Sequence, residues 1–261
     1  DEECMAWIKD EVGRVVGLPR EVGGIPLDEI GATGWGLSHV TDVALKFCDF
    51  DLEGARVVIQ GFGAVGKNTA LFLRDQGAIL VATADTQGSV YNAKGLDIDA
   101  LIKLKEQGRS VNDYSDAQKM NGDALIDIEC DIWVPAARPD VIHDDNVGRL
   151  KTKLVVEGAN IPITYSAEIT LHKQGVLCIP DFIANAGGVI CAAMEYRGSN
   201  KAAVFQSIEE KLRRNTQMVL DRMKNEGVLP RQAAVELATE RVRKAMSYRR
   251  FSLFSSAPGF I

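Results

Sequence analysis

The chain has 261 residues, 46% of them hydrophobic and 25% charged, which is ordinary for a globular protein that buries a sizeable core. Its formal net charge of −6 disfavours a nucleic-acid partner, because proteins that bind nucleic acids usually present a basic face. We expect no membrane partner either, because no apolar stretch reaches the roughly 18 residues that span a bilayer and the acidic start Asp1–Glu2–Glu3 is unlike a signal peptide.

The chain opens with helical patterns and a connector. Apolar residues at helical spacing predict a first helix that runs to about Val15 and is ended by Gly17. A Gly/Pro-rich connector follows from Gly17 to Gly36, and a second helix is predicted from about Trp35 to Cys48.

From residue 56 onward, short apolar strands alternate with helices. We predict, in chain order, strand 56–60, helix 68–76, strand 78–84, helix 96–107, strands 131–134 and 154–156, helix 167–173, strand 176–179 and helices 186–196, 204–225 and 231–246. Continuously apolar strands that alternate with helices are typical of a parallel sheet covered on both faces.

The sequence Gly61–Phe62–Gly63–Ala64–Val65–Gly66 joins the strand 56–60 to the helix 68–76. In such a loop Gly61 allows a tight turn, Gly63 lets the backbone approach a pyrophosphate, and Gly66 lets helix and strand pack closely. Backbone N–H groups and the positive end of the helix dipole then stabilise the phosphates. The strand and helix around the motif favour a dinucleotide-binding loop over a turn with incidental glycines.

The predicted fold class is therefore α/β, a Rossmann-type doubly wound, mostly parallel sheet with flanking N- and C-terminal helices. We expect one dinucleotide-binding domain over residues 1–261, with a helical lead-in at 1–50, a Rossmann core at 51–200 and C-terminal helices at 201–261.

Asp85 ends the next predicted strand about 20 residues beyond the glycine loop, where a carboxylate can accept hydrogen bonds from the ribose hydroxyls of adenosine. Thr86 follows it at the same end of the strand. A 2′-phosphate would be repelled unless a cation compensated, and Thr86–Gln87–Gly88 offer none. We therefore expect NAD as the cofactor, with NADP possible; the alternative for Asp85 is a capping role at the strand end.

Six segments also resemble, in order and approximate spacing, motifs of the glutamate/leucine/phenylalanine/valine dehydrogenase family. They are Gly31–Gly36, Gln60–Gly63, Tyr91–Asp97, Pro135–Ala137, Glu157–Asn160 and Asn185–Val189. The resemblance runs from about Asp1 to Met246, and its Gln-Gly-Phe-Gly and Tyr-Asn-x-x-Gly-Leu-Asp forms are closer to glutamate dehydrogenases than to the branched-chain or aromatic enzymes.

The resemblance implies roles for five cofactor-side residues. Thr33 would contact the cofactor near the nicotinamide, Ala136 and Ala137 would line the adenosine side, and Asn160 and Asn185 would hold the nicotinamide ribose and carboxamide. Without the resemblance, Asn160 is equally a turn residue and Asn185 a helix N-cap.

Two positions depart from the family pattern. Ala64 stands where the family usually has an Asn that faces the pyrophosphate, although the backbone N–H of Ala64 remains. Ala192 stands where glutamate enzymes carry a serine that resembles a donor to the substrate's side-chain carboxylate. Losing one donor to a charged group costs on the order of 1.5–3 kcal/mol, which puts glutamate specificity in doubt.

The family's catalytic lysine and aspartate motifs do not occur in this sequence, so we expect no catalytic residue here. The resemblance implies that they lie on an N-terminal substrate domain, that this chain is the C-terminal cofactor domain and is inactive alone, and that the amino-acid substrate binds through the other domain. By the same analogy, the full-length enzyme is expected to be a homo-oligomer, a hexamer.

The remaining reactive side chains do not suggest other chemistry. The five cysteines are scattered without a Cys-x-x-Cys pair, which argues against disulfides or zinc and favours a cytoplasmic location, with Cys178 and Cys191 as core residues. No metal site is expected. The predicted function is the NAD(P)-binding domain of an amino-acid dehydrogenase that deaminates an L-amino acid, foremost L-glutamate to 2-oxoglutarate and ammonia. The alternative is a non-catalytic nucleotide-sensing Rossmann module.

Overall fold

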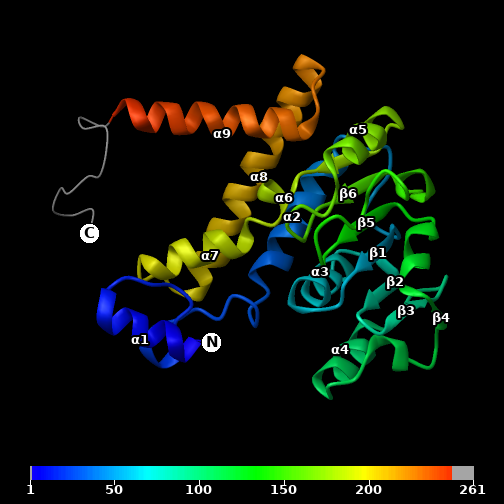
Figure 1. The fold of residues 1–261 in the computed structure, drawn as a ribbon, viewed down its shortest axis with the longest axis horizontal. Helices are drawn as coiled ribbons and strands as arrows, with labels where there is room; N and C mark the ends of the chain where they lie inside the picture. Colours follow the sequence, from blue (N-terminus) through cyan, green and yellow to red (C-terminus); the bar gives the residue numbers. More distant parts are fainter. Residues whose placement is uncertain (1, 249–261) are drawn as a thin grey trace.

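The fold is built around a sheet of seven strands, which lies on the right in Figure 1 with the long C-terminal helices to its left. The computed structural model describes residues 2–248, so residue 1 and residues 249–261 of the expected domain lie outside the described residues. The strands are β1 (Arg56–Gln60), β2 (Ile79–Asp85), β3 (Gly88–Tyr91), β4 (Gln118–Met120), β5 (Ile132–Pro135), β6 (Leu154–Val156) and β7 (Leu177–Ile179). Their order across the sheet is β4-β3-β2-β1-β5-β6-β7.

The central strand β1 pairs in parallel with β2 on one side and with β5 on the other. The chain therefore leaves β1 in one direction and later returns on its other side, which places a topological switch point between β1 and β5. In open α/β sheets, ligands bind outside the carboxyl ends of the strands at such a point. Strands β5, β6 and β7 are also parallel, so the predicted Rossmann-type α/β fold is confirmed.

Two strands at one side of the sheet were not predicted from the sequence: β4 forms the edge, and β3 lies between β4 and β2. β3 follows β2 after a tight turn and pairs with it antiparallel, and β4 pairs antiparallel with β3. β4 has only the three residues Gln118–Lys119–Met120, two of which are exposed. Polar side chains and short length are common ways to protect a sheet edge, and they also remove the apolar pattern by which a strand is recognised.

The helices cover both faces of the sheet. They are α1 (Glu2–Val12), α2 (Ala32–Leu45), α3 (Ala64–Arg74), α4 (Ile98–Glu106), α5 (Tyr165–Lys173), α6 (Asp181–Ala184), α7 (Gly187–Tyr196), α8 (Lys201–Glu226) and α9 (Pro230–Ser247), with short 3-10 turns η1 (Arg20–Val22), η2 (Val111–Asp113), η3 (Gly122–Asp127) and η4 (Val147–Arg149). Within residues 2–248, no helix is both long and apolar enough to cross a membrane.

The buried side chains form one large cluster on each face of the sheet. Val57 and Ile59 of β1 belong to the cluster that includes residues of α2, α3 and α8, whereas Val58 between them belongs to the cluster with α5 and η3. This alternation is what a strand covered on both faces requires. Cys178 and Cys191 are buried in these clusters, as predicted.

Helix α2 begins at Ala32, within the segment that the sequence predicted as a connector up to Gly36. The glycines there serve helix packing. A Cβ atom on Gly34 would lie 2.7 Å from Asn68 Cβ on α3, and one on Gly187 of α7 would lie 2.3 Å from the Ala32 carbonyl oxygen. The expectation of a loop was wrong at this point because local helix propensity penalises glycine, while close packing of three helices requires it.

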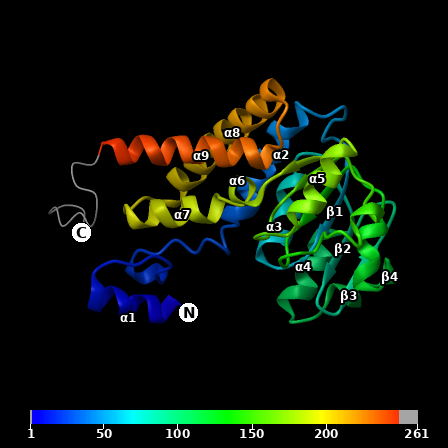
Figure 2. The same ribbon diagram turned by 45° about the horizontal axis from the view of Figure 1, so that its top comes forward.

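Helix α8 packs against α2 and α9 packs against α8, and α9 extends away from the sheet, as Figures 1 and 2 show. α8 is buried along Val204, Ile208 and Leu212, which pack in the same cluster as α2. The far half of α9 is different, because Val242 and Met246 are 58% and 61% exposed. The end of α9 therefore exposes apolar side chains.

Candidate functional site

The glycine loop leaves the carboxyl end of β1 and leads directly into α3. The sequence predicted the helix from Asn68, but it begins at Ala64, so Ala64, Val65 and Gly66 form its first turn. The backbone N–H groups of a first turn lack partners inside the helix, and the N-cap residue Gly63 has no side chain to supply one. These N–H groups and the helix dipole make the start of α3 suited to an anion.

The three glycines of the loop are required for different reasons. Gly61 has φ +106°, and a Cβ atom there would lie 2.8 Å from Ala137 Cβ. A Cβ atom on Gly66 would lie 1.8 Å from the Gly61 carbonyl oxygen. Gly63 has an extended backbone with φ −85°, and nothing in the described part of the chain lies within 4 Å of the position of its missing Cβ. The chain's own packing thus explains Gly61 and Gly66 but not Gly63.

Two cavities lie at the carboxyl ends of the strands, on either side of this loop. The β2-side pocket, of about 460 Å³, is lined by Gly61, Phe62, Gly63, Asp85, Thr86 and Lys105, among others. The β6-side pocket, of about 630 Å³, is lined by Thr33, Val65, Asn160, Asn185 and Ala192, among others. Ala136, Ala137 and Arg138 line both pockets, so the two cavities meet beyond the end of β5.

The structure brings together most of the residues that the sequence nominated. All of them line one of these two pockets except Ala64 and Gly66, which lie in the first turn of α3. Thr33 lies in the first turn of α2 and Ala192 lies on α7, so the β6-side pocket is assembled from elements far apart in the sequence. The individual roles assigned to these residues remain predictions.

The Asp85 carboxylate is held by the protein itself. It accepts hydrogen bonds from Lys105 Nζ at 2.9 Å, Ser110 Oγ at 2.8 Å, the Val111 N–H at 2.9 Å and the Gln87 N–H at 3.0 Å, and its side chain is 8% exposed. Burial alone would raise the pKa of Asp85, but these hydrogen bonds, led by that from Lys105, outweigh burial and lower it. Asp85 is therefore an ionised group that fixes η2 and pairs with a cation.

Sequence reasoning missed Lys105 and Arg138. Lys105 lies in the last turn of α4, 20 residues beyond Asp85, and supplies the cation that the residues directly after Asp85 lack. No local pattern marks this contact. Arg138 had a detectable signal, because it directly follows the Ala136–Ala137 pair at the end of a predicted strand.

Asn160 and Asn185 lie side by side although 25 residues separate them. Asn185 Nδ2 donates to Asn160 Oδ1 at 2.7 Å and to the Ala159 carbonyl oxygen at 3.4 Å. The alternative of an N-cap role for Asn185 does not hold, because Ala186 occupies the N-cap of α7 and Asn185 ends α6. The two amides instead line the β6-side pocket.

A mostly parallel sheet with a glycine loop at the switch point, an uncapped helix start and two adjoining pockets defines a dinucleotide-binding domain of the Rossmann type. A family model described as Glutamate/Leucine/Phenylalanine/Valine dehydrogenase matches residues 23–250. The chain therefore belongs to this family, as its motifs suggested.

Individual relatives agree with this assignment. The chain is 37% identical to the glutamate dehydrogenase of Aeropyrum pernix, over 95% of this chain and 64% of that protein, and 35% identical to the NADP-specific glutamate dehydrogenase of Saccharolobus shibatae, over 85% and 53%. The crystal structure of the hetero-hexameric glutamate dehydrogenase from Thermus thermophilus in its Leu-bound form superposes with a TM-score of 0.85 at 29% identity, over 96% of this chain and 63% of that one. The chain thus spans less than two thirds of the length of these relatives.

Proposed function

We propose that this chain is the NAD(P)-binding domain of an amino-acid dehydrogenase that interconverts an L-amino acid with its 2-oxo acid and ammonia, foremost L-glutamate. Membership of the family and the relatives named glutamate dehydrogenase support this proposal. The main structural support is that position 63 is a glycine although the chain's own packing does not require one. Neither its backbone conformation nor its neighbours require glycine, and a ligand that approaches the loop closely would require it.

The pockets suit the two halves of a dinucleotide. In this arrangement the pyrophosphate would lie against Gly63 and the start of α3, adenosine in the β2-side pocket and the nicotinamide ribose in the β6-side pocket. Thr33, Asn160 and Asn185 would then bind and orient the nicotinamide half. The bound cofactor would accept or donate the hydride, and this domain would contribute its orientation.

The substrate end of the site is incomplete in this proposal. Ala192 lines the β6-side pocket without a hydroxyl to donate to a substrate carboxylate, so selectivity for glutamate over apolar amino acids would be reduced. The catalytic lysine and aspartate would come from a separate substrate domain, and the present polypeptide alone would not deaminate amino acids. The full-length enzyme would be an oligomer, in keeping with the hexameric relative from Thermus thermophilus.

For the cofactor, we propose that NAD is preferred and NADP is tolerated. The Asp85 carboxylate disfavours a 2′-phosphate, whereas Lys105 partly compensates its charge. The relative from Saccharolobus shibatae is named as NADP-specific, so use of NADP occurs within the family.

Calorimetric titration of this polypeptide with NAD and NADP in parallel tests both parts of the proposal. We expect saturable binding of both dinucleotides, with the tighter affinity for NAD. Equal affinities would contradict the role given to Asp85, and binding of neither would contradict the proposed function. Measurable deamination by this polypeptide alone would contradict the assignment of catalysis to another domain.

A further inference from the structure

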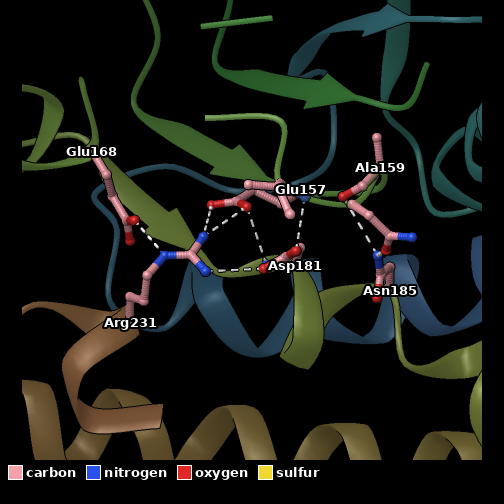
Figure 3. A network of polar contacts seen from close by, with 8 residues as sticks. Glu157, Ala159, Glu168, Asp181, Asn185 and Arg231 are labelled. Carbon is pink, nitrogen blue, oxygen red and sulfur yellow. Dashed lines mark hydrogen bonds and ion pairs between the residues drawn. The ribbon is translucent and has the colours of Figure 1, made fainter. Parts of the chain in front are cut away.

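Arg231, near the start of α9, contacts three carboxylates from three different elements (Figure 3). Its guanidinium donates through Nη2 to Glu157 Oε2 at 2.9 Å, through Nη1 to Asp181 Oδ1 at 3.0 Å, and through Nε to Glu168 Oε2. Glu157 follows β6, Glu168 lies on α5 and Asp181 begins α6. The side chains of Glu157 and Glu168 are 0% and 1% exposed. We call these four residues the Arg231 cluster.

The Arg231 cluster has fewer positive than negative groups, so it depends on its one arginine. Burial, opposed by Arg231 and supported by the nearby Glu168 and Asp181, raises the pKa of Glu157 to about 8. Burial likewise raises the pKa of Glu168, and Cys178 of β7 is a further buried titratable group beside both glutamates. Removal of Arg231 would leave three carboxylates facing one another away from water.

Asp181 connects the cluster to a strained turn. Its second carboxylate oxygen, Oδ2, accepts a hydrogen bond from the Ile161 N–H at 2.8 Å. Ile161 has φ +50°, a left-handed conformation that β-branched residues rarely adopt, and it is 62% exposed, so burial does little to stabilise it. The Ile161 carbonyl in turn accepts from the Asp140 N–H at 2.9 Å. Such strain persists only where the surroundings hold the backbone in place.

The strained turn carries Asn160, the residue directly before Ile161. Asp181 also holds Asn185, the hydrogen-bond partner of Asn160, because the Asn185 N–H donates to the Asp181 carbonyl oxygen at 2.8 Å. Glu157 fixes Asp181 in the same way, by accepting from the Asp181 N–H at 3.2 Å. Figure 3 shows Asn185 beside Ala159, on the side of Asp181 away from Arg231. One aspartate therefore sets the relative placement of the two amides.

We propose that Arg231 is a positioning residue for the nicotinamide end of the site: through Asp181 and Glu157 it holds the strained turn at Ile161 and so fixes Asn160 against Asn185. This inference rests on the proposed function, because the two amides are the groups proposed to bind the nicotinamide half. It makes the placement of the first turn of α9 a condition for binding at the β6-side pocket.

The test compares NADH with ADP, which contains the adenosine and pyrophosphate but lacks the nicotinamide half. For Arg231→Met, we expect NADH to bind roughly tenfold more weakly, which is the lower end of the loss seen when a residue that orients a binding group is removed. The affinity for ADP should stay within about twofold of that of the unmodified chain. Arg222→Met is the matched control. Arg222 pairs with Glu226 and Glu240 across α8 and α9 but has no contact with the turn, so both affinities should be unchanged.

A rescue separates positioning from general destabilisation. Glycine adopts the left-handed conformation without strain, so Ile161→Gly should reduce the effect of Arg231→Met on NADH binding. Arg231→Lys keeps the charge but loses the planar guanidinium with its several N–H donors, so its NADH affinity should lie between those of Arg231→Met and the unmodified chain. If Arg231→Met does not fold, Arg231→Lys takes its place in the comparison.

Equal losses for NADH and ADP, or the same loss with and without Ile161→Gly, would overturn the inference. A native chain that binds neither ligand would instead overturn the proposed function.

Discussion

Gly63→Ala and Gly66→Ala add the same methyl group at two positions three residues apart, but the first should weaken dinucleotide binding and the second should lower the stability of the fold. At position 63 the methyl meets open space within the described residues. The free energy of unfolding should therefore stay within about 0.5 kcal/mol of the unmodified chain. The methyl would, however, occupy the side of the loop from which phosphate oxygens approach. Losing one hydrogen bond to a charged group costs roughly 1.5–3 kcal/mol, which weakens dinucleotide binding by about 10- to 150-fold.

At position 66 the added methyl lies 1.8 Å from the Gly61 carbonyl oxygen and 3.2 Å from Ile59 Cγ2, so the helix and strand must separate. Overpacking of this kind costs typically about 1–3 kcal/mol, and more against backbone atoms. For a chain of this size that corresponds to a fall in Tm of roughly 2–12 °C. Gly66→Ala should thus be recognised by its thermal stability and Gly63→Ala by its ligand affinity.

Differential scanning calorimetry and titration with NAD measure the two effects separately. Gly148→Ala is a suitable control, because no described atom lies within 4 Å of its added methyl and Gly148 lines neither pocket, so neither quantity should change. Wild-type NAD affinity in Gly63→Ala would refute the argument that this glycine is there for a pyrophosphate.

Three further changes follow from the contacts. Lys105→Met leaves the Asp85 charge uncompensated and should weaken NADP binding by about tenfold relative to NAD; parallel titrations that give an unchanged ratio would contradict the role of Lys105. Glu157 has a pKa raised from 4.5 to about 8, so its contribution to stability is full below pH 4.5 and is lost as pH rises through 8. Unfolding free energy should therefore fall over that range by up to about 1.4 kcal/mol per pH unit, and more steeply than in Glu157→Gln, as urea titrations at several pH values would show. Gly34→Ala, with its methyl 2.7 Å from Asn68 Cβ and Thr69 N, should lower stability by roughly 1–3 kcal/mol in the same assay.

The sequence predicted those parts of the site whose chemistry is local. The glycine loop has a buried strand before it and an amphipathic helix after it, so its position in the fold and its suitability for a pyrophosphate could be derived from adjacent residues. The parallel strands were predictable because strands buried on both faces are apolar throughout. The family motifs predicted which distant residues line the two pockets.

The parts that were missed depend on contacts between distant residues. Arg231 lies 74 residues from Glu157, in the polar first turn of a helix, where an arginine is ordinarily exposed. Lys105 is one of two lysines on α4, and its partner Asp85 lies 20 residues earlier, at the end of β2. β4 lacks an apolar pattern because it forms the edge of the sheet, and β3 has only four residues, too few to show one. Local propensity cannot anticipate such contacts, since tertiary packing determines them.

The hydrogen bonds around Asp85 also bear on attempts to redirect this protein to the other coenzyme. Replacing Asp85, the acidic residue at the end of β2, would be the obvious engineering choice. Here, however, the Ser110 hydroxyl and the Val111 N–H would lose their hydrogen-bond acceptor. Coenzyme exchange at this position is thus tied to the integrity of the neighbouring segment. Lys105, 31% exposed at the rim of the pocket, offers an adjustment that leaves those bonds intact.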